Sequence, residues 1–297
     1  MSFGGVFSVL PTPFNSSGDV DPESLTRVID LFIADGVHGF TALGVTSETA
    51  RLTEPERDRV LDVVMAHVGG RVPVVAGTTA DGLRMCIDYT RRAKGAGAAA
   101  VMISPPRMAK INSDGVARHF AEVAAAVDVP IIVQDYPVIS GYAMEPALLA
   151  RIARDVPVAR TIKLEDPPTP FKTARILEQT KGLDVAIFGG LGGVFLLEEL
   201  MAGAAGAMTG FAFPAVLVQI VTLYRAGKID EAADVFYRKV PLMRFEFQEG
   251  IGMAIRKEVL KRRGAIQNAD IRAPGGRLDD GTARALDRVL SWTTSNV

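Results

Sequence analysis

Eight short apolar runs, separated by longer amphipathic stretches, constrain the fold of this chain more than any other feature. Each run is four to seven residues long, and successive runs start 21 to 34 residues apart. Runs that are continuously apolar, instead of alternating with polar residues, are typical of parallel strands covered on both faces. A parallel connection needs a crossover, usually a helix, and each amphipathic stretch can supply one. The runs start near Phe7, Gly39, Pro73, Ala99, Pro130, Val158, Val185 and Gly206.

Helix-start signals lie where the crossovers should begin. Asp21 followed by Pro22 predicts an N-cap and a first helical residue, and Thr53 with Glu56 matches a capping box. Eight strand–helix units place the chain in the α/β class and predict a (β/α)₈ TIM barrel, which typically needs about 250 residues. A doubly wound open sheet is the alternative, but it expects a glycine-rich turn after the first strand. Residues 10–14 read Leu-Pro-Thr-Pro-Phe there, which favours the barrel.

The chain beyond residue 227 has no strand signals and is expected to be helical. We predict helices over Glu231–Phe247, Glu249–Arg263 and Thr282–Ser291, with a loop over Asn268–Asp280. The predicted organisation is therefore a barrel over residues 1–227 and a C-terminal helical extension over 228–297. We expect the extension to pack on the barrel as part of one structural unit.

Composition excludes several classes of function. The chain has 297 residues and a net charge of −1, with no basic stripe, so nucleic acid is not an expected partner. A single cysteine, Cys86, and three histidines without a paired spacing predict no metal site. The first ten residues lack the features of a signal peptide, and no apolar run reaches the roughly 18 residues of a membrane span. We therefore expect a cytoplasmic protein without a membrane partner.

Lys163 is the outlier among the residues of the predicted strands. A lysine in an apolar parallel strand is costly, because a buried ammonium must be paired or lose its proton. Burial lowers the pKa of a lysine, and a neutral amine can attack a carbonyl group. The structural alternative is a lysine that reaches solvent from the strand end or pairs with Glu165. Position alone leaves both interpretations open.

Three other strand ends hold candidate site residues, because reactive groups of a barrel lie at the carboxyl ends of its strands. Tyr136 can relay protons to a lysine adduct, or it is an aromatic residue of the rim. The turn at Gly44–Ser47 offers two hydroxyls and backbone N–H groups for a carboxylate, or it is a helix-entry loop. Gly189 and the glycines that follow it can admit a phosphate or a polar substrate tail, which is weak evidence when taken alone.

Taken together, these positions resemble the dihydrodipicolinate synthase/N-acetylneuraminate lyase family of class I Schiff-base lyases. The resemblance covers essentially the whole chain, including the three C-terminal helices. Tyr136 and Lys163 are 27 residues apart, as in the family. The motifs that carry the resemblance are Leu10–Phe14, the Gly44-Val45-Thr46-Ser47-Glu48 turn, Tyr136, Lys163 and Gly206-Ala207-Met208-Thr209.

The resemblance implies a role for each site residue. Lys163 would form an imine with the keto carbon of pyruvate or another 2-oxo acid, and Tyr136 would shuttle protons. No metal or organic cofactor is needed for this chemistry. The residues implied in substrate binding are Val45, Thr46 and Ser47 in the turn, Gly189 after the seventh strand, and Met208, whose backbone carbonyl would face the lysine.

Three departures argue against the synthase that gives the family its name. Val45 replaces a threonine that can relay a proton. The segment Ser104–Arg107 lacks the tyrosine that the synthase places in a neighbouring subunit's site, and the stretch after Tyr136 lacks its substrate-binding arginine. These losses leave the residues for imine formation in place.

The local sequences around Tyr136, Met208 and Glu249 resemble those of the family branch that acts on sugar acids. We therefore expect a dehydratase or aldolase of a 2-keto-3-deoxy sugar acid, such as 2-keto-3-deoxyarabonate. Ser47, Tyr136 and a bound water are the candidates for the group that assists departure of the C4 hydroxyl, and the sequence does not choose among them. A synthase-type condensation of pyruvate with an aldehyde, a phosphate-binding barrel enzyme and a non-catalytic 2-oxo acid sensor are the alternatives. By resemblance, the chain is expected to form a homo-oligomer, most often a tetramer.

Overall fold

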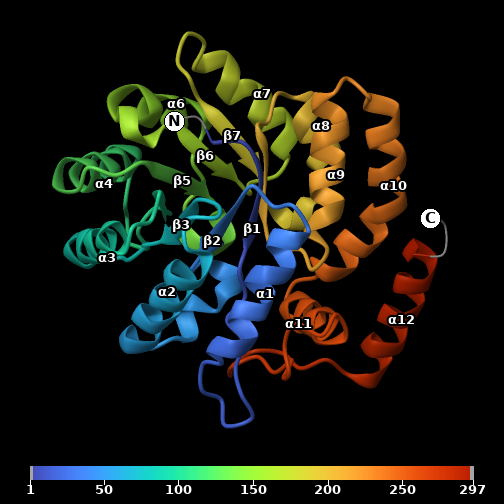
Figure 1. The fold of residues 1–297 in the computed structure, drawn as a ribbon. Helices are drawn as coiled ribbons and strands as arrows, with labels where there is room; N and C mark the ends of the chain where they lie inside the picture. The colour runs from blue at the N-terminus through green and yellow to red at the C-terminus, as the bar shows by residue number, and fades with distance from the viewer. Residues whose placement is uncertain (1–2, 295–297) are drawn as a thin grey trace.

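The core of the molecule is a closed barrel of eight parallel strands (Figure 1). The computed structural model describes residues 3–294. Each strand pairs with the next in sequence order, and the barrel closes where β8 pairs with β1. The predicted TIM barrel is therefore confirmed. The strands are β1 (Gly5–Val9), β2 (Gly39–Ala42), β3 (Val74–Gly77), β4 (Ala100–Ile103), β5 (Ile131–Asp135), β6 (Thr161–Leu164), β7 (Ala186–Gly189) and β8 (Gly206–Thr209).

Helices surround the barrel and form its outer layer (Figure 1). The helices of the barrel are α1 (Pro22–Ala34), α2 (Glu54–Val68), α3 (Leu83–Gly95), α4 (Ser113–Ala126), α5 (Pro137–Ser140), α6 (Pro146–Asp155), α7 (Thr169–Gln179), α8 (Leu196–Met201) and α9 (Pro214–Arg225). They are followed by α10 (Ile229–Glu246), α11 (Gly252–Arg262) and α12 (Asp280–Thr294). Short 3₁₀ turns η1 (Val45–Ser47), η2 (Thr49–Arg51), η3 (Pro157–Ala159) and η4 (Leu191–Gly193) complete the fold.

Local signals in the sequence start the first two helices where they were expected. The Asp21 side chain accepts a hydrogen bond from the Ser24 backbone N–H and caps α1, while Pro22 is the first helical residue. Thr53 and Glu56 form the predicted capping box of α2. The sixth strand differs from expectation, because it starts at Thr161 and not near Val158. Pro157 begins the 3₁₀ turn η3, which occupies the residues just before the strand.

The interior of the barrel is filled by side chains. Buried residues from β1, β3, β4, β5, β7 and β8 form one compact apolar cluster inside the ring of strands, with aromatic contacts between Phe7 and Phe188. This packing makes the barrel a solid core and not a pore, as is usual for the fold. The polar side chains at the carboxyl ends of the strands form the candidate site.

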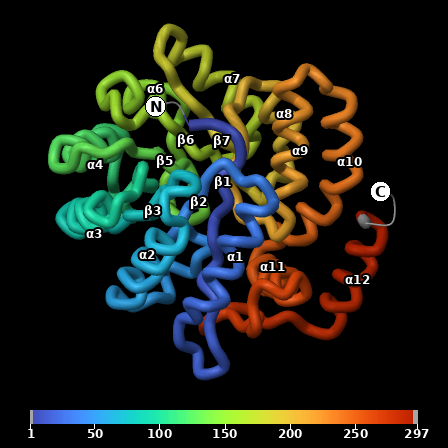
Figure 2. The backbone as a smooth tube through the Cα atoms, in the orientation of Figure 1, coloured from blue at the N-terminus to red at the C-terminus, as the bar shows by residue number. Residues whose placement is uncertain are grey.

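The C-terminal helices lie against one side of the barrel and continue around it (Figure 2). α10 packs on α9 and on α12, and α11 follows α10 after a short turn. The expected loop between α11 and α12 is present, and it passes beside the turn at residues 15–18, where Asn268 donates to the Asn15 carbonyl. No helix within residues 3–294 is long and apolar enough to cross a membrane.

Candidate active site

Lys163 projects from β6 into the mouth of the barrel. Its neighbours Ile162 and Leu164 pack outward against the helices, so alternation along the strand turns the lysine inward. The side chain is only 5% exposed, and its Nζ lies 3.1 Å from Oε2 of Glu165. The pairing that the structural alternative expected is therefore present. A carboxylate beside an amine stabilises its charged form, and it is also a group that can take up a proton from a compound bound there.

Glu165 is a residue of the candidate site that the sequence indicates only as a partner for the lysine. Its Oε2 accepts a 2.7 Å hydrogen bond from Nε2 of Gln134, whose Oε1 accepts one from the Ser104 hydroxyl. The carboxylate is also confined by Gly190, where a Cβ would lie 2.3 Å from Cγ of Glu165. Glu165 lies two residues after Lys163, so strand alternation was the signal that could have placed both groups in the barrel mouth.

Tyr136 follows β5 directly and lies half-buried near the same carboxylate. Burial raises the pKa of its phenol, and the negative charges of Glu165 and Glu249 raise it further. Glu249 belongs to the turn between α10 and α11, so the C-terminal extension contributes charge to this part of the site. The phenol therefore keeps its proton through the neutral range, which is the form that can donate a proton to an adduct.

The turn after β2 brings Val45, Thr46 and Ser47 together, but their side chains have different hydrogen-bond partners. The Ser47 hydroxyl donates to the Leu10 carbonyl and accepts from the Gly44 N–H, so it fixes the turn. The Thr46 hydroxyl is buried and has no hydrogen-bond partner among the described residues. Val45 is half-buried and brings no polar side-chain group. Of the two hydroxyls, that of Thr46 is the one left for a ligand.

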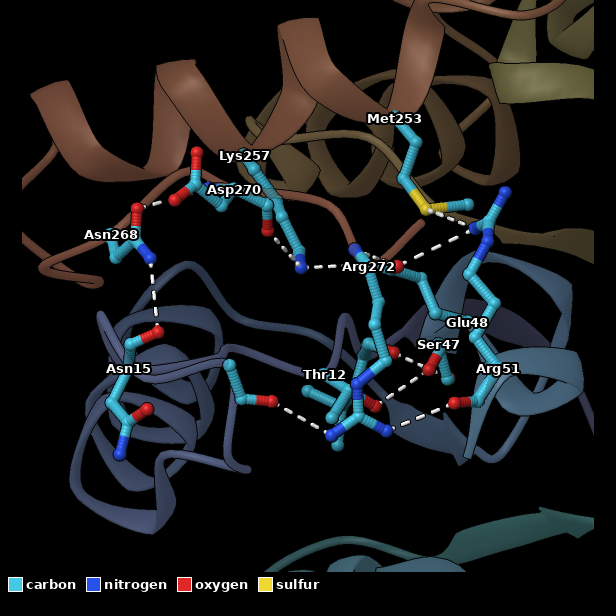
Figure 3. Close-up of polar contacts among 12 residues, drawn as sticks. Thr12, Asn15, Ser47, Glu48, Arg51, Met253, Lys257, Asn268, Asp270 and Arg272 are labelled. Atoms are coloured by element: carbon cyan, nitrogen blue, oxygen red, sulfur yellow. Dashed lines mark hydrogen bonds and ion pairs between the residues drawn. The ribbon is translucent and has the colours of Figure 1, made fainter. Parts of the chain in front are cut away.

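Residues from the C-terminal extension contact this turn through hydrogen bonds and an ion pair (Figure 3). Glu48, which ends η1 with a left-handed φ of 56°, pairs through Oε1 with Nζ of the fully buried Lys257, at 2.5 Å. Its Oε2 accepts a 3.0 Å hydrogen bond from the Arg272 backbone N–H. The Arg272 side chain in turn donates to the Arg51 carbonyl. Both carboxylate oxygens of Glu48 are therefore engaged, which fixes the geometry of the turn that carries Thr46.

Gly189 and Met208 lie near the carboxyl ends of neighbouring strands. Packing accounts for the residue type at each position. A Cβ at Gly189 would lie 1.7 Å from Oε2 of Glu199, so only glycine leaves room for this buried carboxyl group. Burial raises the pKa of Glu199 to about 7. The Met208 side chain belongs to the apolar cluster inside the barrel. Their predicted contacts with substrate remain predictions.

Across the described part of the chain, His, Cys, Asp and Glu side chains form no group of three that could hold a metal ion. The polar groups at the mouth of the barrel include an amine, a carboxylate, a phenol and a hydroxyl without a partner among the described residues. This set can form an imine with a carbonyl compound and then move protons to and from the adduct.

Comparisons with known proteins agree with this chemistry. The family model of the dihydrodipicolinate synthetase family matches residues 2–292. The L-2-keto-3-deoxyarabonate dehydratase of Azospirillum brasilense is 32% identical, over 97% of this chain and 96% of its own. The 4-hydroxy-tetrahydrodipicolinate synthase of Methanoculleus marisnigri is 30% identical, over 97% and 98%.

A solved structure extends the agreement to three dimensions. The dihydrodipicolinate synthase of Rhodopseudomonas palustris superposes with a TM-score of 0.92 and 34% sequence identity, over 98% of this chain and 97% of that one. The resemblance predicted from the site motifs is therefore confirmed along the whole described chain. The protein is an enzyme of the dihydrodipicolinate synthetase family, whose members are class I lyases and aldolases.

Proposed function

We propose that this enzyme forms a Schiff base through Lys163 and dehydrates a 2-keto-3-deoxy sugar acid. The observation that supports the proposal most is the buried carboxylate of Glu165, 3.1 Å from the lysine amine and fixed by Gln134. A carboxylate in this place can accept a proton from the amine first and from the bound substrate afterwards. It also supplies the proton-transfer group that the sequence did not identify.

The proposed reaction balances in atoms and charge. The neutral amine of Lys163 adds to the C2 carbonyl of the substrate, and loss of one water gives a protonated imine. This cation acidifies the C3 proton, which Glu165 accepts as the electron pair moves into the enamine. The enamine then expels the C4 hydroxyl, which takes up the proton that Glu165 has just accepted and leaves as water, so that Glu165 becomes a carboxylate again. Hydrolysis of the imine consumes one water and restores the free lysine.

Dehydration is proposed over synthase chemistry for two reasons. The chain lacks the tyrosine and the arginine that the synthase uses for its aldehyde substrate, at Ser104–Arg107 and after Tyr136. A relative that aligns over 97% of the chain is named as a dehydratase of L-2-keto-3-deoxyarabonate. Aldol cleavage of the same substrate class starts from the same imine and differs only in which bond at C4 breaks.

Product analysis separates these reactions. The enzyme would be incubated with L-2-keto-3-deoxyarabonate, and the products identified by mass spectrometry and NMR. We expect a five-carbon product that is lighter by one water. Pyruvate with a two-carbon aldehyde would instead establish aldol cleavage. Turnover of pyruvate with an aldehyde alone would favour condensation, and a borohydride-stable adduct without turnover of any 2-oxo acid would support a sensor.

Tyr136→Phe is expected to lower kcat for the sugar acid by about 100- to 1,000-fold, because general acid–base groups typically contribute this much. The adduct on Lys163 should still form, since the amine and Glu165 are unchanged. Steady-state kinetics and borohydride trapping would be compared with Tyr142→Phe, which removes a rim hydroxyl that contacts Ser113. An unchanged kcat in Tyr136→Phe would contradict the proton-relay role.

We also propose that the enzyme acts on its small-molecule substrate as a homo-oligomer, most often a tetramer in this family. The support is the family resemblance along the whole chain, although one solved relative is described as a monomeric synthase variant. Because the cross-subunit tyrosine is missing, imine formation should depend little on the neighbouring chain. Light scattering of the purified enzyme would measure the assembly.

A further inference from the structure

Gln134 places a buried amide group between the end of β4 and the end of β6. Ile132, two residues earlier in β5, belongs to the apolar cluster inside the barrel, so strand alternation also turns Gln134 inward. Gln134 is only 2% exposed. Its Nε2 donates to Oε2 of Glu165 at 2.7 Å, and its Oε1 accepts from the Ser104 hydroxyl at 2.9 Å. Both ends of the amide are therefore paired, which offsets the cost of burying it.

The three side chains form a chain of hydrogen bonds with a fixed direction. An ionised carboxylate can only accept, so the amide nitrogen must face Glu165 and the amide oxygen must face Ser104. The Ser104 hydroxyl donates to that oxygen and holds it away from the carboxylate, which would repel it. Ser104 is itself held in place, because its backbone N–H donates to Oγ1 of Thr79 at 3.0 Å.

The two oxygens of Glu165 have different surroundings. Oε2 accepts from Gln134 and lies 3.1 Å from Nζ of Lys163. Among residues 3–294, no group donates to Oε1, and this oxygen is not one of the polar atoms that are enclosed without a partner. A Cβ at Gly190 would lie 2.7 Å from Oε1, so glycine leaves room beside it. Oε1 is therefore the oxygen left for a compound bound in the mouth of the barrel.

We propose that Gln134, oriented by Ser104, is a positioning residue that holds Oε2 of Glu165 and directs Oε1 to the C3 proton of the substrate imine. The proposal rests on the proposed function and adds two residues to it. In this step the C3–H bond breaks, its electron pair enters the enamine, and the proton binds Oε1. The same oxygen then gives the proton to the departing C4 hydroxyl, so that Glu165 is ionised again.

The three residues come from neighbouring strands of one chain, which can hold them rigidly. Ser104 follows β4, Gln134 lies in β5 and Glu165 follows β6, and these strands are adjacent in the barrel. Gln134 lies opposite Lys163 in the register of β5 and β6. Groups on strands are placed more precisely than groups on long loops. Precision matters here, because a displacement of about 1 Å at a reacting group can lower a rate about 100-fold.

The test separates imine formation from loss of the C3 proton. Borohydride trapping against pyruvate concentration measures the first step, and exchange of the pyruvate methyl protons in D₂O, followed by NMR, measures the second. Gln134→Met removes both hydrogen bonds of the amide, and we expect exchange to slow about 10- to 100-fold. The half-saturating pyruvate concentration for trapping should change less than about threefold, because the nucleophile Lys163 is unchanged.

A second background tests whether Gln134 acts through Glu165. In Glu165→Gln the base is already lost, so adding Gln134→Met should slow exchange by less than about twofold more. A role in folding alone would slow exchange equally in both backgrounds. Gln134→Glu would place a second carboxyl group against Glu165, and two such groups resist ionising together. We therefore expect the acidic limb of the pH profile of exchange to move up by at least about one unit.

Ser104 is tested by removing and then keeping its hydroxyl. Ser104→Ala should slow exchange about 3- to 10-fold, the size expected for one hydrogen bond between neutral groups. Ser104→Thr keeps the hydroxyl and should keep the wild-type rate. Ser24→Ala is the matched control, because Ser24 is also a buried serine whose hydroxyl donates to a carboxylate, that of Asp21. It should lower the melting temperature without changing exchange.

Three results would overturn the inference. They are exchange at the wild-type rate in folded Gln134→Met, an equal fall of imine formation and exchange, and equal slowing in the wild-type and Glu165→Gln backgrounds. If Gln134→Met does not fold, an unchanged pH profile in Gln134→Glu would overturn it. The proposed function fails differently: the wild type would form no adduct with any 2-oxo acid, or Glu165→Gln alone would exchange at the wild-type rate.

Discussion

Lys163→Ala is expected to abolish covalent trapping of pyruvate and of the sugar acid, and to lower kcat by about 10⁵-fold or more. Losses of this size follow removal of the nucleophile from enzymes that work through a covalent intermediate. The reason is specific here, because the enamine forms only after the amine has joined the C2 carbon. Glu165 keeps its hydrogen bond to Gln134 in the variant, so the barrel mouth should stay folded.

Intact-mass and peptide analysis after borohydride reduction would measure the first effect, and steady-state kinetics the second. Lys172→Ala is the matched control, because Lys172 is also a buried, ion-paired lysine, bound to Asp135 and Asp166. Its adduct should remain on Lys163. An adduct in Lys163→Ala on any other lysine, with turnover retained, would contradict the assignment.

Glu165→Gln is expected to lower kcat by about 10²- to 10⁴-fold, the usual contribution of a general base. Glutamine keeps the shape of the side chain and can still accept the hydrogen bond from Gln134. It cannot take up a proton, so loss of the C3 proton should become slow while the imine still forms. Proton exchange at the methyl group of pyruvate in D₂O, followed by NMR, would measure this step directly.

The exchange experiment distinguishes catalysis by Glu165 from simple pairing with Lys163. If the carboxylate only stabilised the ammonium, its removal would leave more neutral amine, and exchange would be as fast as in the wild type or faster. We expect exchange to be at least about 100-fold slower. Exchange at the wild-type rate in Glu165→Gln would rule out the role as a base.

Much of the fold could be predicted because its signals are local. Continuous apolar runs and N-caps such as Asp21 depend on a few neighbouring residues, and they predict the first two helices and every strand except the sixth. The sixth strand was misplaced because Val158 and Ala159 are apolar, although Pro157 folds them into a 3₁₀ turn. An apolar composition alone does not distinguish a buried turn from a buried strand.

The candidate site was only partly predictable because its contacts join distant segments. Lys163 was found from its own neighbours, since a lysine in an apolar strand is anomalous. The engagement of Ser47 with Leu10 could not be predicted, because it depends on how the first two strands meet. The pairing of Lys257 with Glu48 gave no signal in the sequence, since α11 is rich in charged residues and the sequence does not show which of them turns inward.

The ion pair between Glu48 and Lys257 joins residues 209 positions apart. This separation affects when the enzyme becomes active during its synthesis. Chains emerge and fold from the N-terminus, and contacts between distant residues form late because closing a long loop costs entropy. Strands β1 to β8 can therefore assemble while the turn that carries Thr46 still lacks its support. Imine formation by a nascent or refolding chain should lag behind the appearance of its secondary structure, until α11 docks.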